Sequence, residues 1–220
     1  MDLNELRRDE RIELLRTLGD VGANAPTLCV GWSAADLAAH LVASERYAGV
    51  PLAISYPLRG VLPSRVVVAG MRSLQKVSQR QLVRAKAHGW SWLLERLAAG
   101  PPATFRWGSI GLVRLVEEWI HHEDIRRANN ARTRQPSPDL DEALWEAATL
   151  LTGFAEFRPG RDGIEAVLPD GRTRRIGDIS RARVEGTPGE ILLFVAGRVT
   201  VAQVNVTGDL ANIAGLNLAV

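Results

Sequence analysis

Acidic and histidine side chains recur at helical spacing in the segment 113–127. Glu117 and His121 are four residues apart and Asp124 follows three residues later, so a helix would carry all three on one face. Carboxylate and imidazole groups are common ligands of divalent metals such as zinc. The spacing predicts a metal site, and the alternative is a structural acid–base pair that stabilises the helix.

The segment itself reads as a buried helix. It contains no glycine or proline, and its apolar residues fall nearly all round the helical projection. Burying an ionised carboxylate costs several kcal/mol unless a cation or a donor compensates it, so Glu117 needs a partner. His122 points about a hundred degrees away from His121 and is not predicted as a ligand. Glu118 and His122 offer a second reading, as a structural pair on a solvated face.

Composition limits the class of protein. The chain has 220 residues, 46% of them hydrophobic and 24% charged, which suits one medium domain or two small ones with a proper core. The net charge is only +2, and basic residues alternate with acidic ones, so nucleic-acid binding is not indicated. Neither a long apolar run nor a signal-peptide pattern occurs, which predicts a cytoplasmic protein without a membrane partner.

The single cysteine limits the metal chemistry. One cysteine, Cys29, excludes an intramolecular disulfide and any zinc site built from several thiolates. A metal would therefore need histidine and carboxylate ligands. Cys29 is interpreted as a small buried hydrophobe; a reactive thiol is the alternative, but no basic residue adjoins it in the sequence to lower its pKa.

A second histidine lies in the middle of a well-marked helix. Ser33 is a good N-cap, Asp36 can complete a capping box, and Trp32 with Leu37 can form a hydrophobic staple. His40 then faces the core with the apolar stripe. By itself, a lone core histidine is usually a satisfied structural residue.

The remaining pattern predicts a mainly helical chain with a small α+β tail. Helices are expected at 4–18, with Leu6, Ile12, Leu15 and Leu18 as its apolar positions, and at 64–87, 92–97 and 140–157. The prolines and glycines of 49–63 forbid a continuous helix there, and such a long connection could cover a pocket. Strands are expected at 163–168, 173–176, 182–185 and 201–206, the first two as a hairpin, with a helix beginning after Thr187.

These residues together resemble a known family. Gly31-Trp32-Ser33, Asp36-Leu37 and His40, combined with Glu117-x-x-x-His121-x-x-Asp124, resemble the DinB-like bundles, and within them the actinobacterial branch that includes mycothiol-dependent maleylpyruvate isomerase. The tail, from Gly186-Thr187-Pro188-Gly189 to Gly197-Arg198, resembles the sterol-carrier-like C-terminal domain of that branch. The resemblance implies a DinB-like metal-binding four-helix bundle over 1–158 and a small α+β domain over 159–220.

The resemblance also implies a ligand set. In that branch one histidine of the second helix and a Glu-x-x-x-His pair of the last bundle helix hold a divalent metal, usually zinc, which here corresponds to His40, Glu117 and His121. Three ligands leave one tetrahedral position open, as a catalytic zinc site requires. Asp124 would accept the other imidazole N–H of a ligand. Arg198 is a candidate for binding an anionic group of the thiol or substrate.

The function implied is that of a divalent-metal-dependent, mycothiol-using transferase or isomerase. The metal would activate the thiol for addition to an electrophilic small molecule, and the protein would be a monomer or homodimer. The alternative is a non-catalytic, metal-containing protein that binds a small molecule or a lipid, with 49–63 as the gate. A purely structural bundle is the third hypothesis, and it leaves Glu117 without a cation.

Overall fold

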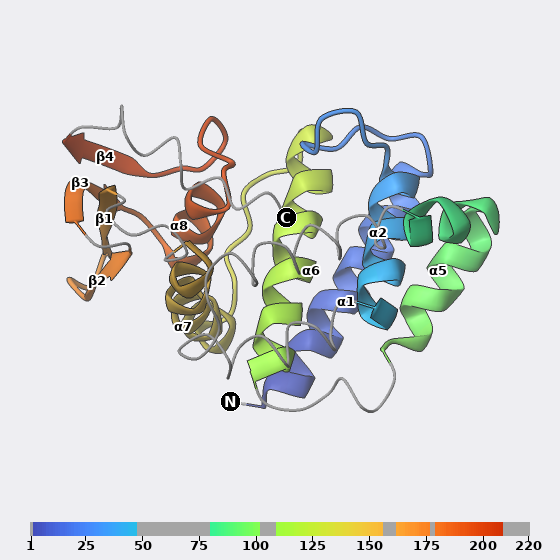
Figure 1. Cartoon of the computed structure of the whole chain (residues 1–220), viewed down its shortest axis with the longest axis horizontal. Coiled ribbons are helices and arrows are strands. Elements are labelled where there is room, and N and C mark those ends of the chain that lie inside the picture. Colours follow the sequence, from blue (N-terminus) through green and yellow to red (C-terminus); the bar gives the residue numbers. More distant parts are fainter. Residues whose placement is uncertain (1, 48–79, 102–108, 156–161, 177–178, 209–220) are drawn as a thin grey trace. The chain divides into compact units, whose positions relative to one another are not determined.

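The computed structural model describes residues 2–47, 80–101, 109–155, 162–176 and 179–208. In chain order they form α1 (Leu3–Val21), α2 (Ala34–Tyr47), α5 (Trp90–Ala99), α6 (Ser109–Ala128), α7 (Pro138–Ala155), β1 (Asp162–Val167), β2 (Thr173–Ile176), β3 (Ile179–Glu185), α8 (Pro188–Val195) and β4 (Asn205–Gly208) (Figure 1). The predicted class, mainly helical with a small α+β tail, is confirmed. Within these residues no helix is both long and apolar enough to cross a membrane.

Contacts divide the chain into two compact units. One comprises residues 2–133 and the other 134–220 together with Met1. The predicted domain boundary after residue 158 would place α7 with the bundle, and it stays a prediction. The predicted connection at 49–63 and the first part of the helix expected at 64–87 lie outside the described residues, whereas residues 80–87 are helical as expected.

The first unit is a packed set of helices. α1 lies along α6, α5 packs against α1 and α2, and α2 also contacts α6 (Figure 1). Leucines of α1, α2 and α5 fill the space between them and are almost completely buried, as is Ile125 of α6. Close packing of this kind fixes the directions in which α2 and α6 present their polar side chains.

The helix expected around Glu117 and His121 is α6, and it is buried nearly all round, as predicted. Leu115, Trp119 and Ile120 are buried together with the polar run from His121 to Asp124. The alternative that placed Glu118 and His122 on a solvated face is wrong, because both side chains are buried. A polar run without solvent requires internal partners.

The start of α2 follows the predicted capping box. The backbone N–H of Ser33 donates to Oδ2 of Asp36 at 3.0 Å, and the N–H of Asp36 donates back to Oγ of Ser33 at 3.3 Å. Each side chain thus satisfies a backbone donor that the first helical turn leaves free. Of the predicted staple, Leu37 belongs to the buried core cluster and Trp32 is partly buried and packs against that cluster. This cap sets the point at which α2 begins, and hence the position of His40.

The buried face of α1 differs from the prediction. Ile12, an expected core position, is 49% exposed, whereas Arg7, Glu10 and Arg11 are buried. The helix buries charge because charged residues of α2 and α6 neutralise it, a tertiary effect that helical periodicity does not contain. Leu14 and Leu18 continue the same buried stripe toward the end of the helix.

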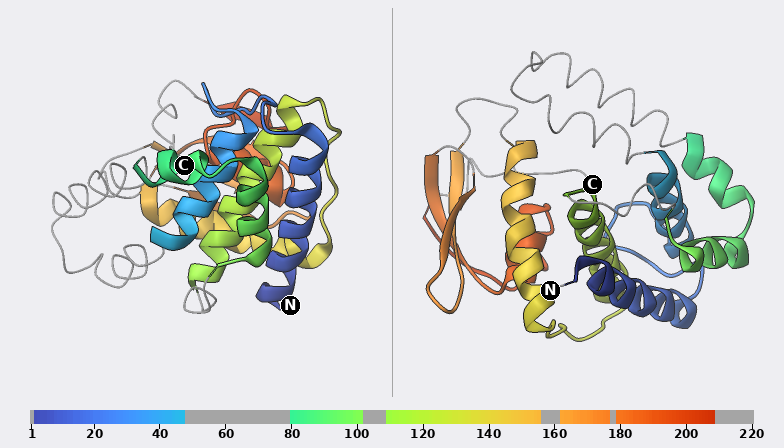
Figure 2. Two further views of the ribbon diagram at one scale, coloured as in Figure 1. Left: turned by 90° about the vertical axis from the view of Figure 1, so that its right-hand side faces the viewer. Right: turned by 90° about the horizontal axis from the view of Figure 1, so that it is seen from below.

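The second unit contains a four-stranded sheet in the order β2-β1-β3-β4. β1 pairs antiparallel with β2 and parallel with β3, and β4 is antiparallel to β3. α7 and α8 lie against one face of this sheet (Figure 2). The predicted hairpin and the helix after Thr187 are confirmed. The strand expected from Val201 is shorter than predicted, because Val201 and Ala202 bond back to Arg198 in a turn and β4 begins at Asn205.

Candidate metal centre

Helices α2 and α6 bring the three predicted ligands together. Nε2 of His40 lies 3.3 Å from Oε1 of Glu117. The imidazole rings of His40 and His121 have centroids 5.0 Å apart and are nearly perpendicular, at 78°. His40 of α2 therefore lies beside both Glu117 and His121 of α6, although 77 positions separate His40 from Glu117 in the sequence.

Two of these donor atoms lack a hydrogen-bond partner. Nε2 of His40 and Nε2 of His121 are buried, and no described residue hydrogen-bonds to either of them. The 3.3 Å contact between His40 and Glu117 is close enough for charge attraction but does not have hydrogen-bond geometry. Buried polar atoms without partners are rare in native proteins, and a bound cation is one of the few arrangements that satisfies them. The residues present fit a divalent metal.

Asp124 holds His121 in the tautomer that a metal requires. Its Oδ2 lies 2.9 Å from Nδ1 of His121, and both side chains are fully buried. An ionised carboxylate only accepts hydrogen bonds, so Nδ1 donates and Nε2 keeps its lone pair. Burial lowers the pKa of His121, although Asp124 acts in the opposite direction. The lowered pKa keeps the ring neutral. Asp124 thus contacts His121 as its spacing predicted, and its role beside a metal stays a prediction.

Glu117 is held by an arginine of its own helix. Nη1 of Arg114 donates to Oε2 of Glu117 at 2.8 Å and to Oγ of Ser44 at 2.8 Å, which leaves Oε1 directed at His40. Burial alone would raise the pKa of Glu117, but the charge of Arg114, helped by His40 and His121, holds that pKa well below its usual range. Glu117 is therefore ionised and oriented before any metal binds.

We expect Arg114→Met to destabilise the metal-free protein by about 2–3 kcal/mol, because the variant leaves Glu117 without its cation in a mostly buried position. Zinc should restore part of this loss, since the ion supplies the missing positive charge. Chemical denaturation with and without zinc measures both effects. Arg114→Lys, which keeps the charge, should lose less. Equal stabilisation of wild type and Arg114→Met by zinc would contradict the arrangement described.

A different set of donors also lies close together. Sγ of Cys29, Nδ1 of His121 and Oδ2 of Asp124 are mutually within 4.8 Å. The separation of Nδ1 and Oδ2 is 2.9 Å, a hydrogen-bond distance. Two ligands on one tetrahedral zinc, each bonded at about 2.0–2.3 Å, lie about 3.3 Å or more apart. This group is better explained as a set of hydrogen bonds behind His121 than as the ligand set itself.

The other histidines have different surroundings. Nδ1 of His122 lies 2.7 Å from Oε1 of Glu10, and its Nε2 lies 2.8 Å from Oγ1 of Thr17. Both ring nitrogens are occupied, which agrees with the prediction that His122 is not a ligand. His88 is exposed and stacks on Trp92. Arg198 belongs to the other unit, where its guanidinium donates to the carbonyl of Ala196 at 2.6 Å, and its role in binding an anion stays a prediction.

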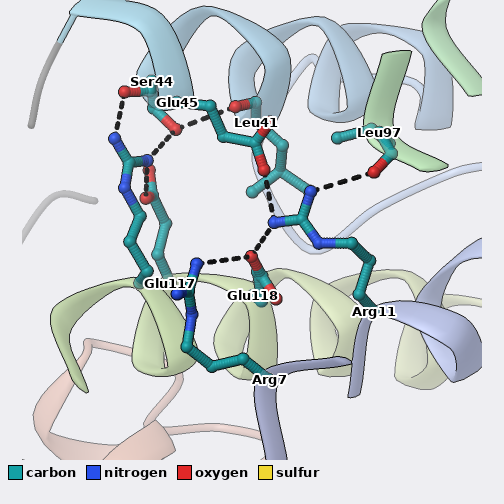
Figure 3. A network of polar contacts seen from close by, with 9 residues as sticks. Arg7, Arg11, Leu41, Ser44, Glu45, Leu97, Glu117 and Glu118 are labelled. Carbon is teal, nitrogen blue, oxygen red and sulfur yellow. Dashed lines mark hydrogen bonds and ion pairs between the residues drawn. The ribbon is translucent and has the colours of Figure 1, made fainter. Parts of the chain in front are cut away.

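A buried ionic network adjoins this centre, and the sequence analysis missed it. Arg11 of α1 contacts Glu45 of α2 and Glu118 of α6, and its Nη1 donates to the carbonyl of Leu97 at 2.9 Å (Figure 3). Arg7 approaches Glu118 at 4.0 Å. Burial raises the pKa of Glu118 to about 7, even though Arg11 and Arg7 oppose this. The network joins the same helices that carry the candidate ligands.

The comparisons with known proteins concern the family and the fold of the chain. The model of the mycothiol maleylpyruvate isomerase N-terminal domain family matches residues 6–126, which include His40, Glu117 and His121. No curated protein sequence matches the chain. Among solved structures, the mycothiol-dependent maleylpyruvate isomerase has a TM-score of 0.52 with 17% identity, and a histidine-to-alanine mutant of it has a TM-score of 0.54, also with 17% identity. Each alignment covers 96% of both chains, so the similarity of fold includes the helical bundle, which is DinB-like, and the small α+β part that follows it.

Proposed function

The chain belongs to the mycothiol maleylpyruvate isomerase N-terminal domain family, and we propose that it is a divalent-metal-dependent transferase or isomerase that uses mycothiol. His40, Glu117 and His121 are the proposed ligands, with zinc as the expected ion. The observation that carries the proposal is the pair of buried imidazole nitrogens, Nε2 of His40 and Nε2 of His121, that have no hydrogen-bond partner among the described residues.

The three side chains would leave one tetrahedral position for a cosubstrate. A divalent ion in this place supplies a Lewis acid that lowers the pKa of a thiol bound to it. Arg114 neutralises Glu117, and Asp124 fixes the tautomer of His121, so both ligands are held in place before binding. Cys29, the one cysteine of the chain, lies on the Nδ1 side of His121 and donates to Asp124, so its thiol is not placed to act as the nucleophile.

The substrate is accordingly a small electrophile that reacts with a thiol. For an isomerase, the sulfur would add to an activated double bond, the resulting single bond would rotate, and elimination would release the thiol unchanged. For a transferase, the sulfur would stay bonded to the electrophilic carbon, and the leaving group would depart with the bonding electron pair.

Cobalt-substituted protein tests the proposal. Addition of mycothiol should change the visible spectrum of bound Co²⁺, whereas mycothiol methylated on sulfur should not, because it offers no acidic thiol. His40→Ala should lose both the bound cobalt and the change. If mycothiol did not change the visible spectrum of cobalt-loaded wild-type protein, the proposed binding of the thiol at the metal would be wrong. A tightly retained small molecule without turnover would favour the non-catalytic alternative.

A further inference from the structure

Cys29 occupies a defined position behind the candidate metal centre. It lies in the loop between α1 and α2, and its Sγ is 3.2 Å from Oδ2 of Asp124. The same oxygen lies 2.9 Å from Nδ1 of His121. Because both donors meet one carboxylate oxygen, the position of the Asp124 carboxylate depends on the thiol as well as on the imidazole.

The loop that carries Cys29 is attached to α6 at this turn. The backbone N–H of Leu28 donates to the carbonyl of Asp124 at 3.1 Å, and the side-chain amide of Asn129 donates to the carbonyl of Pro26 at 3.0 Å. The N–H of Cys29 donates to Oγ1 of Thr27 at 3.2 Å. On the other side, the N–H of Trp32 donates to the carbonyl of Cys29 at 3.0 Å, so the fold sets the direction of the thiol.

The thiol acts on a carboxylate that has no access to water. Asp124 and His121 are both 0% exposed, whereas Cys29 is partly exposed, so the thiol lies between the carboxylate and the solvent. An Asp124 carboxylate with one donor fewer would be held less firmly, and so would the imidazole that it orients.

We propose that Cys29 is a positioning residue: its S–H donates to Asp124 and thereby keeps the ring of His121 in its place beside His40. The effect on metal binding rests on the proposed function, whereas the hydrogen bond and the orientation of His121 do not. Two of the measurements below therefore use the metal-free protein, and they test the hydrogen bond between Cys29 and Asp124 even if no metal binds.

The first measurement is the infrared S–H stretch of metal-free protein. The chain has one cysteine, so the band belongs to Cys29 and must vanish in Cys29→Ala. Donation to a carboxylate lowers the frequency, and Asp124→Asn should therefore shift the band upward. The band should also persist after zinc is added. An unshifted band in Asp124→Asn, or a band that zinc abolishes, would overturn the proposal, the latter because it would make Cys29 a metal-bound thiolate.

The second measurement is the nitrogen NMR spectrum of the His121 ring in metal-free protein. Wild type and Cys29→Ser should show one tautomer with the proton on Nδ1, because a serine hydroxyl also donates. Cys29→Ala should keep the proton on Nδ1, because Asp124 remains as its acceptor, but should show a shifted or broadened signal as the position of the ring becomes less fixed. Unchanged His121 signals in Cys29→Ala would overturn the proposal even if Asp124→Asn failed to fold.

The third measurement is zinc affinity by competition with a chelator. Cys29→Ala should bind zinc about 10-fold more weakly, at the lower end of the losses seen when partners of metal ligands are removed. Cys29→Ser should stay within about threefold of wild type. Val30→Ala is the matched control, since Val30 is in the same loop and 99% exposed. Equal losses in Cys29→Ala and Cys29→Ser would assign the effect to packing and overturn the hydrogen-bonding role.

Discussion

His40→Ala should bind zinc more than about 100-fold more weakly than wild type, because loss of a ligand exceeds the 10–100-fold effects of removing the partners of ligands. Its described contacts are few: the 3.3 Å approach to Glu117 and ring contacts with Trp32 and His121. The variant should therefore fold, and a titration of metal-free protein against a chelating indicator measures the loss. Glu117→Gln should show a similar loss, because a neutral amide is a much weaker ligand.

His88→Ala is the matched control for the loss of an imidazole. His88 is exposed and its described ring contact is with Trp92, far along the chain from the three candidate ligands. This variant should bind zinc as wild type does. If His40→Ala and His88→Ala retained the same affinity, the proposed ligand set would be wrong.

Arg11→Met should destabilise the protein by about 3–5 kcal/mol at pH 8, the usual result of removing one partner from a buried ion pair. The variant leaves Glu118 buried with Arg7 4.0 Å away and leaves Glu45 with the more distant charge of Arg114, and it removes the donor to the carbonyl of Leu97. Chemical denaturation measures the loss. Arg16→Met is the control, since Arg16 pairs with Glu13 on the exposed side of the same helix and its loss should be small.

The loss of stability caused by Arg11→Met should depend on pH. Burial raises the pKa of Glu118 to about 7 in the wild-type fold, so this group favours folding when protonated and loses that contribution as pH rises through 7. Removing Arg11 raises the pKa of Glu118 further, so the additional loss of folding stability appears at higher pH. The difference between wild type and variant should thus grow from pH 5 to pH 8. The double variant Arg11→Met/Glu118→Gln should recover most of the lost stability. A loss of stability in Arg11→Met that did not change with pH would contradict this explanation.

Local pattern predicted much of the fold. The buried character of α6 followed from its residues, because apolar side chains on all sides exclude a surface helix. The capping box at Ser33 and the hairpin before Thr173 also follow short-range rules, since each depends on residues within a few positions of one another. Thr187 and Pro188 mark the start of α8 for the same reason.

Contacts between distant segments were not predictable in the same way. Helical periodicity assigned Ile12 to the core of α1, but the buried side chains are Arg7, Glu10 and Arg11, whose partners come from other helices. No sequence spacing indicates that Glu45 and Glu118 meet Arg11. One signal was present in the sequence. The helix at 4–18 carries many charges, and the helix around Glu117 was predicted to bury carboxylates, so the two could have been expected to pair.

The candidate site shows the same division. Glu117, His121 and Asp124 share one helix, and their spacing predicted that His121 and Asp124 would meet. Arg114 lies three residues before Glu117 and was detectable as a helical ion pair, although the sequence analysis did not use it. His40 as a ligand depended on the family resemblance, and the contact between Cys29 and Asp124 depends on a loop whose course only tertiary structure defines.

X-ray absorption at the zinc edge, on zinc-loaded protein without added thiol, tests the central claim most directly. The three ligands proposed here are two imidazoles and a carboxylate, so the first shell should contain only nitrogen and oxygen at about 2.0–2.2 Å, with the outer-shell scattering of two histidine rings. A sulfur atom at about 2.3 Å would place Cys29 on the metal and contradict the account.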